Sequence, residues 1–486
     1  MKKELEIIDI ITGIVGEDDI LVSDVDLACY SYDSVSRALR AFSKDFRLRA
    51  DAVARPESTQ EVVEIVKVAN EYGVPLIPRG AGTSLAGQLL PVKGGVVLDF
   101  SKMGKIKMIS TDDQCVIVEP GVEYFKLRSR LDEKGYFFPP EPGSAKVCTI
   151  GGMVANNASG SSAAKFGTTK NYVMDLEVVL ASGEVIKTGS RTIKSCSGYD
   201  LTSLFVGSEG TLGIITEITL RILPKPEGEV SFVASFGSIG AACDAGRRLL
   251  EKLNPSVLEF VDRTTTLGMK RYDESLKLSL APSLIVRLSG RESTLDDQLS
   301  EAKEICGTAK KFKIYKDELQ KSLWQARHSA GPILSSLSPH IKSTFTQAPA
   351  TLDFAVPLSK IVESTEAIDE IVKEHNLIVL RFGHLGDGNI HHIIEIPLGS
   401  EKDLKMLREV QRVMAEKMIE FGGTMTAEHG VGLWKAPYLE LEKGHSMEVM
   451  RQIKKTLDPN NILNPGKMAL DGVSDMALFK GVDPHG

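Results

Sequence analysis

The chain has 486 residues, of which 42% are hydrophobic and 25% charged, and its formal net charge is −7. This composition predicts a globular protein of two or three domains, and the acidic balance argues against a nucleic-acid surface, which needs an excess of basic residues. The six cysteines contain no C-x-x-C pair and no apolar run approaches the roughly 18 to 20 residues of a membrane span, so we expect neither a disulfide framework, nor a cysteine-ligated iron–sulfur cluster, nor a transmembrane segment.

The N-terminal part is expected to be helical over residues 1–45, because apolar residues recur at helical spacing between positions 5 and 14. A short strand at 51–56 should follow it. Ser-Thr-Gln-Glu at 58–61 then predicts the start of a helix that ends at Gly73. A short apolar run at 73–77 is expected to form a second strand, which leads into the next stretch of the chain.

That stretch, residues 78–87, reads Pro-Arg-Gly-Ala-Gly-Thr-Ser-Leu-Ala-Gly. Glycine lets the main chain bend tightly and approach a ligand, and successive backbone N–H groups can form an anion-binding nest. A second small and polar stretch occupies residues 151–162, and neither stretch matches the Walker or Rossmann fingerprint. An ordinary glycine turn is the alternative for the first loop, but two such loops together favour an extended pyrophosphate held from two sides.

Residues 91–226 are rich in predicted strands, with a hairpin turn at 181–183. Pro-Lys-Pro-Glu-Gly at 224–228 predicts a linker, because two prolines and a glycine interrupt a sheet. Two related strand–helix–strand patterns follow, the second beginning with a strand at 351–356. They predict an antiparallel sheet with helices on one face. Residues 470–486 are expected to be a loose tail.

The dipeptide Asp-Gly at 387–388 lies between two apolar runs, which is typical of a two-residue hairpin turn. This turn would pair His384 with His391, with Cβ atoms roughly 4.5 to 5.5 Å apart on one face. Two imidazoles so placed could bind one divalent metal or one anionic substrate. His392 would point the other way, so we expect it to be structural. Glu428 is the expected third ligand, since two imidazoles and a carboxylate leave positions open for substrate.

Five motifs follow one another along the chain, at 78–87, 151–160, 207–213, 383–389 and 428–430. With these motifs the chain resembles the flavoprotein superfamily of vanillyl-alcohol oxidase, with its FAD-binding domain of the PCMH type. Within that superfamily it is similar to the branch that contains glycolate oxidases and D-lactate dehydrogenases. The resemblance implies an α+β fold with a two-lobed FAD-binding domain, a ferredoxin-like antiparallel substrate or cap domain, and a helical C-terminal segment.

On this resemblance we expect four segments. An N-terminal helical segment would cover residues 1–45 and the FAD-binding domain residues 46–226. The substrate domain would cover residues 227–420, and residues 421–486 would return to the FAD domain.

The resemblance also implies which residues form the site. FAD would bind without a covalent link, because Thr83 stands where covalently linked members carry histidine. The residues expected to contact FAD are Pro78, Arg79, Gly80, Ala81, Gly82, Thr83, Ser84, Gly87, Pro142, Gly143, Ser144, Thr149, Gly151, Gly152, Asn156, Ser159, Gly160, Ser162, Glu209, Gly210, Gly213, Ile214, Ile215 and Asn464.

The expected catalytic residues are His429 as the base and Arg327, in a Trp-x-x-Arg segment, as the group that holds a substrate carboxylate. His384, His391 and Glu428 would bind Zn, Mn or Fe. The alternatives are that Arg327 is an ordinary helix-surface arginine, and that Glu428 and His429 merely cap a helix-to-loop junction.

The activity that the resemblance implies is oxidation of a small D-2-hydroxy acid, D-lactate first and glycolate next, with hydride transfer to flavin N5. Thr351 and Ile393 stand where D-2-hydroxyglutarate dehydrogenases carry lysine and asparagine, which favours a substrate with one carboxylate. The alternatives are a D-2-hydroxyglutarate dehydrogenase, a non-redox flavin transferase like alkylglycerone-phosphate synthase, and a non-catalytic companion subunit.

The partners and the location are less constrained. The electron acceptor could be a quinone, a cytochrome, an electron-transfer flavoprotein or oxygen, and self-association stays open. We expect a cytoplasmic protein, with peripheral attachment to a membrane as the variant of that expectation.

Overall fold

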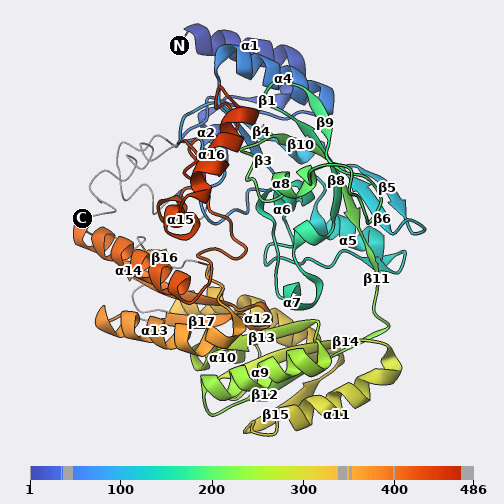
Figure 1. Cartoon of the computed structure of the whole chain (residues 1–486), viewed down its shortest axis with the longest axis vertical. Coiled ribbons are helices and arrows are strands. Elements are labelled where there is room, and N and C mark those ends of the chain that lie inside the picture. The colour runs from blue at the N-terminus through green and yellow to red at the C-terminus, as the bar shows by residue number, and fades with distance from the viewer. Residues whose placement is uncertain are drawn as a thin grey trace. The chain divides into compact units, whose positions relative to one another are not determined.

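The computed structural model describes residues 2–33, 35–36, 48–337, 347–349, 353–377, 379–397 and 400–471. The chain forms two compact units (Figure 1). The first unit comprises Met1–Ser159, Thr168–Lys225 and Glu428–Gly486, and the second comprises Gly160–Gly167 and Pro226–Ala427. The α+β class predicted from the sequence is confirmed, because each unit combines helices with sheets.

The first unit contains a four-stranded sheet in the order β1-β2-β4-β3, in which β2, β4 and β3 run parallel. Its strands are β1 (Ile20–Leu21), β2 (Ala52–Ala54), β3 (Leu76–Arg79) and β4 (Val96–Asp99). The predicted helix is α4 (Thr59–Tyr72), capped by Ser58 and ended by Gly73 at φ 69°. Helix α4 packs against α1 (Lys2–Val15), and their apolar faces join one buried core with the sheet (Figure 1).

A second sheet of this unit has five antiparallel strands in the order β5-β6-β10-β8-β9. Its strands are β5 (Ile106–Ser110), β6 (Cys115–Val118), β8 (Val173–Val179), β9 (Val185–Lys187) and β10 (Ile214–Arg221). The predicted turn between β8 and β9 is confirmed, since Gly183 has φ 82° and its N–H bonds Leu180 O at 2.8 Å. The remaining elements are α2 (Asp24–Tyr30), α5 (Tyr124–Asp132), β7 (Tyr136–Phe137), α6 (Ile150–Asn156), α8 (Leu201–Phe205), β11 (Leu223–Pro224), α15 (Ala436–Lys443) and α16 (Ser446–Leu457).

The second unit is built on a seven-stranded antiparallel sheet in the order β15-β12-β14-β13-β17-β18-β16. Its strands are β12 (Gly228–Ser235), β13 (Val257–Val261), β14 (Ser283–Gly290), β15 (Lys311–Tyr315), β16 (Gln347–Pro349), β17 (Val379–His384) and β18 (Asn389–Pro397). Its helices are α7 (Ala163–Phe166), α9 (Ile239–Leu253), α10 (Arg263–Tyr272), α11 (Leu295–Ile305), α12 (Asp317–Leu337), α13 (Ile361–Glu374) and α14 (Glu401–Glu420).

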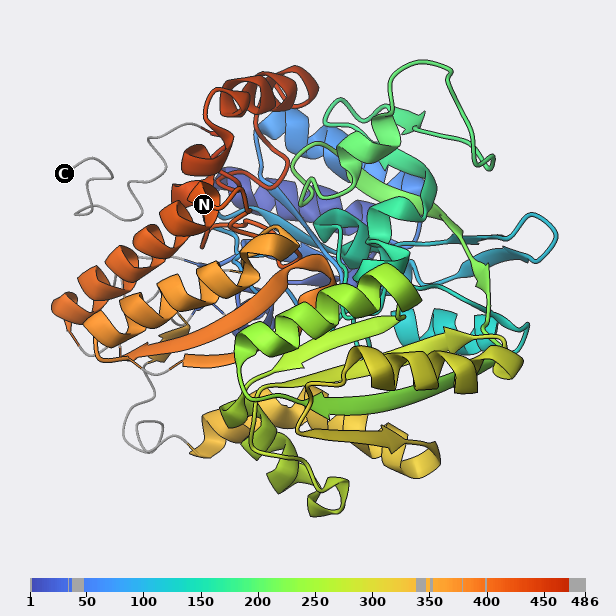
Figure 2. The same cartoon turned by 60° about the horizontal axis from the view of Figure 1, so that its bottom comes forward.

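Helices cover both faces of this sheet, so the expectation of one covered face was incomplete. Helix α9 packs against α11 and α13, and α13 packs against α14 (Figure 2). Side chains alternate along β13: Leu258 faces α9 at Gly246, whereas Val257 and Val261 join a core that includes Met269 of α10 and residues of α12. The second face thus carries its own helical layer.

Two further expectations meet the structure only in part. The strand expected at 351–356 is absent over its described residues, where Asp353 and Ala355 instead form isolated bridges to Thr426 and Thr424. Thr351 and most of the tail expected at 470–486 lie outside the described residues. In the part of the chain that the structure describes, no helix combines the length and apolarity needed to cross a membrane.

Candidate functional site

A cavity in the first unit is formed by the two small-residue stretches and by residues that come later in the chain. It is lined by Pro78, Arg79, Gly80, Ala81, Gly82, Thr83, Ser84, Gln88, Leu89, Phe100, Pro120, Thr149, Gly151, Gly152, Ala155, Asn156, Glu209, Gly210, Gly213, Ile215 and Asn464. Most of the residues expected to contact FAD are therefore brought together. The glycines permit the close approach: a Cβ on Gly80 would lie 2.2 Å from Thr149 Oγ1.

Eight of the expected residues do not line this cavity: Gly87, Pro142, Gly143, Ser144, Ser159, Gly160, Ser162 and Ile214. Ile214 is buried in the core shared by the sheets and α1. Gly160 and Ser162 belong to the second unit. Gly87 turns its N–H away to Asp33 Oδ2 at 2.8 Å.

Two polar atoms of the cavity residues are buried without a hydrogen-bond partner among the described residues, namely Arg79 Nη1 and Asn464 Oδ1. The Arg79 guanidinium lies 5.0 Å from the centre of the Tyr30 ring, and burial lowers the pKa of Arg79 against the opposing charge of Asp99. A buried donor or acceptor left unpaired costs about 1 to 3 kcal/mol. A ligand with anionic and hydrogen-bonding groups would satisfy both atoms, so the residues present fit FAD.

Glu209 holds the wall of the cavity to a distant part of the chain. Its carboxylate accepts the N–H of Val431 at 2.6 Å and of Gly432 at 2.9 Å. Asn464 donates from Nδ2 to Glu209 O at 2.7 Å and to Gln88 O at 3.0 Å. Burial raises the pKa of Glu209, although the two N–H donors oppose that shift. Hydrogen bonds thus join the cavity wall to segments more than two hundred residues further along the chain.

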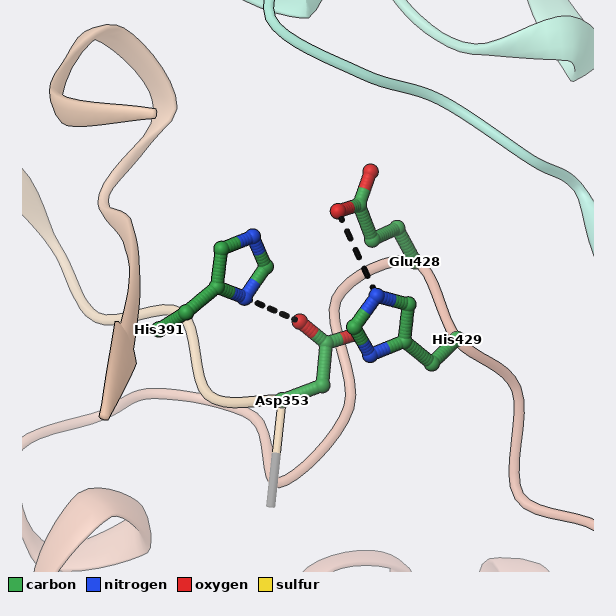
Figure 3. Close-up of side chains that lie close together, drawn as sticks. All are labelled: Asp353, His391, Glu428 and His429. Atoms are coloured by element: carbon green, nitrogen blue, oxygen red, sulfur yellow. Dashed lines mark ion pairs between the residues drawn. The ribbon is translucent and has the colours of Figure 1, made fainter. Parts of the chain in front are cut away.

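Glu428 and His429 lie on the segment that Glu209 holds. Ser159 Oγ donates to Glu428 Oε2 at 3.0 Å, and Gln88 Nε2 donates to the carbonyl oxygen of His429 at 2.7 Å. His429 Nε2 lies 3.6 Å from Glu428 Oε1, as the dashed line in Figure 3 marks. Neither residue caps a helix, because the described helix that follows, α15, begins only at Ala436.

The histidine hairpin has a register different from the predicted one. His384 pairs with Asn389, and His391 pairs with Phe382. Residues Leu385–Asp387 form a 3₁₀ turn that ends at Gly388 with φ 81°, in place of the two-residue turn. The shift is by two residues, so it preserves the face of each side chain. The rings of His384 and His391 still meet, with centroids 5.2 Å apart at 84°.

His391 faces a buried carboxylate that the sequence did not single out as part of the site. Its Nδ1 lies 3.5 Å from Asp353 Oδ1 (Figure 3). Asp353 Oδ1 also accepts Asn389 Nδ2 at 3.0 Å, and the N–H of Ala427 reaches Asp353 O at 2.7 Å and Oδ2 at 3.2 Å.

Arg327 is buried at 8% exposure, and thus is not a helix-surface arginine. Its Nε donates to Glu259 Oε2 at 2.7 Å, with Nη2 on the same oxygen, and its guanidinium lies 4.5 Å from the centre of the Phe382 ring. The other carboxylate oxygen of Glu259 contacts His384 Nδ1. Burial by itself would raise the pKa of Glu259, but the charges of Arg327 and His384 hold it well below its usual range.

His392 lies on the opposite face of β18 from His391. It pairs across the hairpin with Arg381, and its Nδ1 is 2.8 Å from Ile390 O. Burial, aided by the charge of Arg381, lowers the pKa of His392 to about 3. This neutral and enclosed imidazole fits the structural role expected for it.

Sequence reasoning did not identify Glu259, Asp353 or Gln88 as site residues. A signal existed for Glu259, since a lone carboxylate stands inside the apolar run Val-Leu-Glu-Phe-Val of β13. Asp353 and Gln88 carried no comparable signal, because their roles depend on contacts with segments far along the chain.

Comparison with known proteins places the chain in context. A family described as "FAD linked oxidases, C-terminal domain" matches residues 225–468, and one described as "FAD binding domain" matches residues 50–189. Glycolate oxidase subunit GlcD of Bacillus subtilis (strain 168) is 36% identical over 459 residues, which cover 93% of this chain and 94% of that protein. The mitochondrial D-lactate dehydrogenase [cytochrome] of Arabidopsis thaliana is 37% identical over 423 residues, which cover 86% of this chain and 73% of that protein.

Solved structures share the fold. p-Cresol methylhydroxylase with substrate bound superposes with a TM-score of 0.78 at 16% identity, covering 96% of this chain and 97% of that one. The 4-ethylphenol oxidase from Gulosibacter chungangensis superposes with a TM-score of 0.75 at 18% identity, with the same coverage of 96% and 97%. These matches confirm the predicted PCMH-type architecture.

Proposed function

The chain belongs to the FAD-linked oxidases, a family of FAD oxidoreductases, and from this premise we propose that it oxidises a small D-2-hydroxy acid to the 2-oxo acid. D-Lactate is the first candidate and glycolate or a similar short acid the next. The proposal is supported by relatives named glycolate oxidase and D-lactate dehydrogenase. It is also supported by a cavity whose unpaired Arg79 and Asn464 atoms suit a non-covalently bound FAD.

One observation carries the assignment of a catalytic base. Gln88 lines the cavity, and its side-chain amide binds the carbonyl oxygen of His429. The residue that bears the imidazole is therefore anchored to the wall of the cavity within the first unit. His429 would take the proton of the substrate hydroxyl at a ring nitrogen. FAD, when bound, supplies the acceptor for the hydride that leaves the α-carbon.

The donor set also fits a divalent cation. Asp353, His391, Glu428 and His429 offer carboxylate and imidazole atoms of the kind that bind Zn, Mn or Fe. His384 is not in this donor group, but the family resemblance assigns His384, His391 and Glu428 as the ligands. We adopt that assignment and reserve His429 as the base. A cation held there would polarise the substrate hydroxyl as a Lewis acid.

Arg327 is the proposed partner of the substrate carboxylate. Its Nε and Nη2 are engaged by one oxygen of Glu259, which fixes the plane of the guanidinium. A planar guanidinium oriented in this way presents its remaining N–H groups in a set direction, which a lysine could not reproduce. The substrate would thereby be bound through its single carboxylate.

The decisive experiment mixes the purified yellow protein anaerobically with D-lactate, L-lactate, glycolate and D-2-hydroxyglutarate and follows the flavin absorbance. Bleaching by D-lactate or glycolate, faster than by L-lactate, is the expected result. A flavin that stays oxidised with every acid would refute the proposal. A higher kcat/KM for D-2-hydroxyglutarate would instead assign the dicarboxylate as substrate.

A further inference from the structure

Both imidazoles on the shared face of the hairpin present the same ring nitrogen to a carboxylate. His384 Nδ1 contacts Glu259 Oε1, and His391 Nδ1 lies 3.5 Å from Asp353 Oδ1. The two carboxylates come from different parts of the second unit, Glu259 from β13 and Asp353 from the segment before α13. A carboxylate thus lies beside the Nδ1 of each ring, in hydrogen-bonding contact at His384 and at ion-pair distance at His391.

Both carboxylates are almost completely buried, at 1% exposure each. Each is also fixed by a second partner. Glu259 accepts from the guanidinium of Arg327, and Asp353 accepts from Asn389 Nδ2 and from the N–H of Ala427. The second partner fixes the orientation of each carboxylate, so the carboxylate determines the orientation of the imidazole ring.

We propose that Glu259 and Asp353 are positioning residues that hold the Nδ1–H of His384 and His391, so that both Nε2 atoms bind one divalent cation. A carboxylate on the far nitrogen of a ligating histidine fixes its tautomer and raises the basicity of the ligating nitrogen. The inference rests on the proposed function, because it specifies the metal site invoked there. Glu259 has a second task, since the same carboxylate orients Arg327.

The competing arrangement is that Asp353 itself ligates the cation. In that arrangement Oδ1 would still accept from Asn389 and Oδ2 from Ala427, because each carboxylate oxygen carries two lone-pair sites. The two arrangements differ in whether His384 supplies an imidazole nitrogen to the metal, which replacing His384 tests.

The first test measures Mn²⁺ binding to the full-length flavoprotein by equilibrium dialysis, comparing the parent with Glu259→Gln and Asp353→Asn. Each variant should raise the Kd for Mn²⁺ by about 10- to 100-fold, as loss of a supporting carboxylate does at other sites. The matched control is Asp262→Asn, whose half-buried carboxylate accepts from Thr265 N at 2.7 Å and from Arg381 N at 3.2 Å but faces neither histidine. It should bind Mn²⁺ like the parent. Parental affinity in E259Q and D353N, or no saturable binding to the parent, would overturn the inference.

E259Q also leaves Arg327 without its carboxylate and could disturb the fold. The second test therefore relies on the parent protein and on a variant of His384. Pulsed EPR of the Mn²⁺-loaded parent should detect two coordinated imidazoles, and His384→Gln should reduce the number to one. His375→Gln is the control, since His375 follows the last residue of α13 and its Nδ1 lies 3.0 Å from Ile371 O. An unchanged imidazole count in H384Q, or a single imidazole in the parent, would overturn the proposal.

These outcomes separate the inference from the proposed function. If E259Q and D353N weaken Mn²⁺ binding while no 2-hydroxy acid reduces the parental flavin, the two carboxylates position the ligands but the substrate assignment fails. If D-lactate reduces the flavin at parental rates in all variants and Mn²⁺ binding is unchanged, the function stands and the positioning role fails.

Discussion

His429 is anchored through its backbone, where Gln88 binds the carbonyl oxygen, while its ring lies near Glu428. Substituting His429→Gln should therefore leave the fold and the bound FAD in place and remove only the proton acceptor. We expect the rate of anaerobic flavin reduction by D-lactate to fall about 10²- to 10⁴-fold in stopped-flow measurements. His445→Gln, next to α16, should reduce at the parental rate. Parental kinetics in H429Q would show that another group takes the proton.

Lys467 is buried near Glu209 and donates to Leu90 O at 2.8 Å. Burial lowers the pKa of Lys467 from 10.5 to about 7, against the favourable charge of Glu209. Between these two values the unfolded chain binds more protons than the folded protein, so this residue makes the free energy of unfolding rise with pH. From pH 7 toward pH 10, we therefore expect the free energy of unfolding of the parent to rise relative to that of Lys467→Met. The slope cannot exceed about 1.4 kcal/mol per pH unit.

Denaturant titrations of both proteins at pH 7, 8 and 9 check this expectation. The lost hydrogen bonds of K467M shift its curve by an amount that does not depend on pH. Two parallel curves would show that Lys467 keeps its proton in the folded state throughout this range.

At the scale of the elements, the segment after α2 supports the glycine-rich loop. Asp33 is buried and accepts from Gly87 N at 2.8 Å, Ser84 Oγ at 3.2 Å and Val35 N at 3.1 Å. Asp33→Ala would leave these donors unpaired and loosen the loop. We expect the Kd for FAD to rise about tenfold, which corresponds to a loss of about 1.4 kcal/mol of binding free energy. The Kd is measured by the quenching of FAD fluorescence on binding to the apoprotein. Asp26→Ala, which removes an exposed carboxylate from α2 itself, should have no such effect.

The hairpin shows what a short sequence signal can and cannot predict. The strands β17 and β18 and the shared face of His384 and His391 followed from the sequence. The turn did not, because its length depends on a tertiary contact: a Cβ on Gly388 would lie 2.0 Å from Val356 O. A local preference for a two-residue turn was thus overridden by the packing of a distant segment.

Strand β13 was not predicted at all. Its run of five residues carries Glu259, whose charge makes the segment look less like a buried strand. The carboxylate is tolerated there only because Arg327 and His384 neutralise it, and both residues are far away in sequence. Patterns based on hydrophobicity therefore fail to predict strands that carry a buried and paired charge.

At the scale of the molecule, the cavity depends on hydrogen bonds that no local pattern contains. Gln88 bonds His429, Glu209 bonds Val431, and Asn464 bonds the carbonyl of Gln88. The small-residue composition of the loops predicted an anion site, but only the family resemblance predicted which loops meet. The buried atoms Arg79 Nη1 and Asn464 Oδ1, which have no hydrogen-bond partner among the described residues, could not be predicted from the sequence, because their burial depends on the tertiary structure.

Calorimetry can test the division into two units. All residues that line the cavity belong to the first unit, so FAD should raise the unfolding temperature of one transition only. At a free FAD concentration of 100 times the Kd, the stabilisation free energy of that unit is about 2.7 kcal/mol. Leu258→Ala, in the core of the second unit, should lower the other transition. A single transition that both perturbations move together would mean that the units unfold cooperatively.

The assignment of every cavity-lining residue to one unit, and of the histidine hairpin with Glu259 and Arg327 to the other, has an evolutionary consequence. Mutations in the hairpin unit can alter which molecule is accepted without eroding the affinity for the flavin. Related chains could therefore diverge in substrate specificity while retaining the same flavin cofactor.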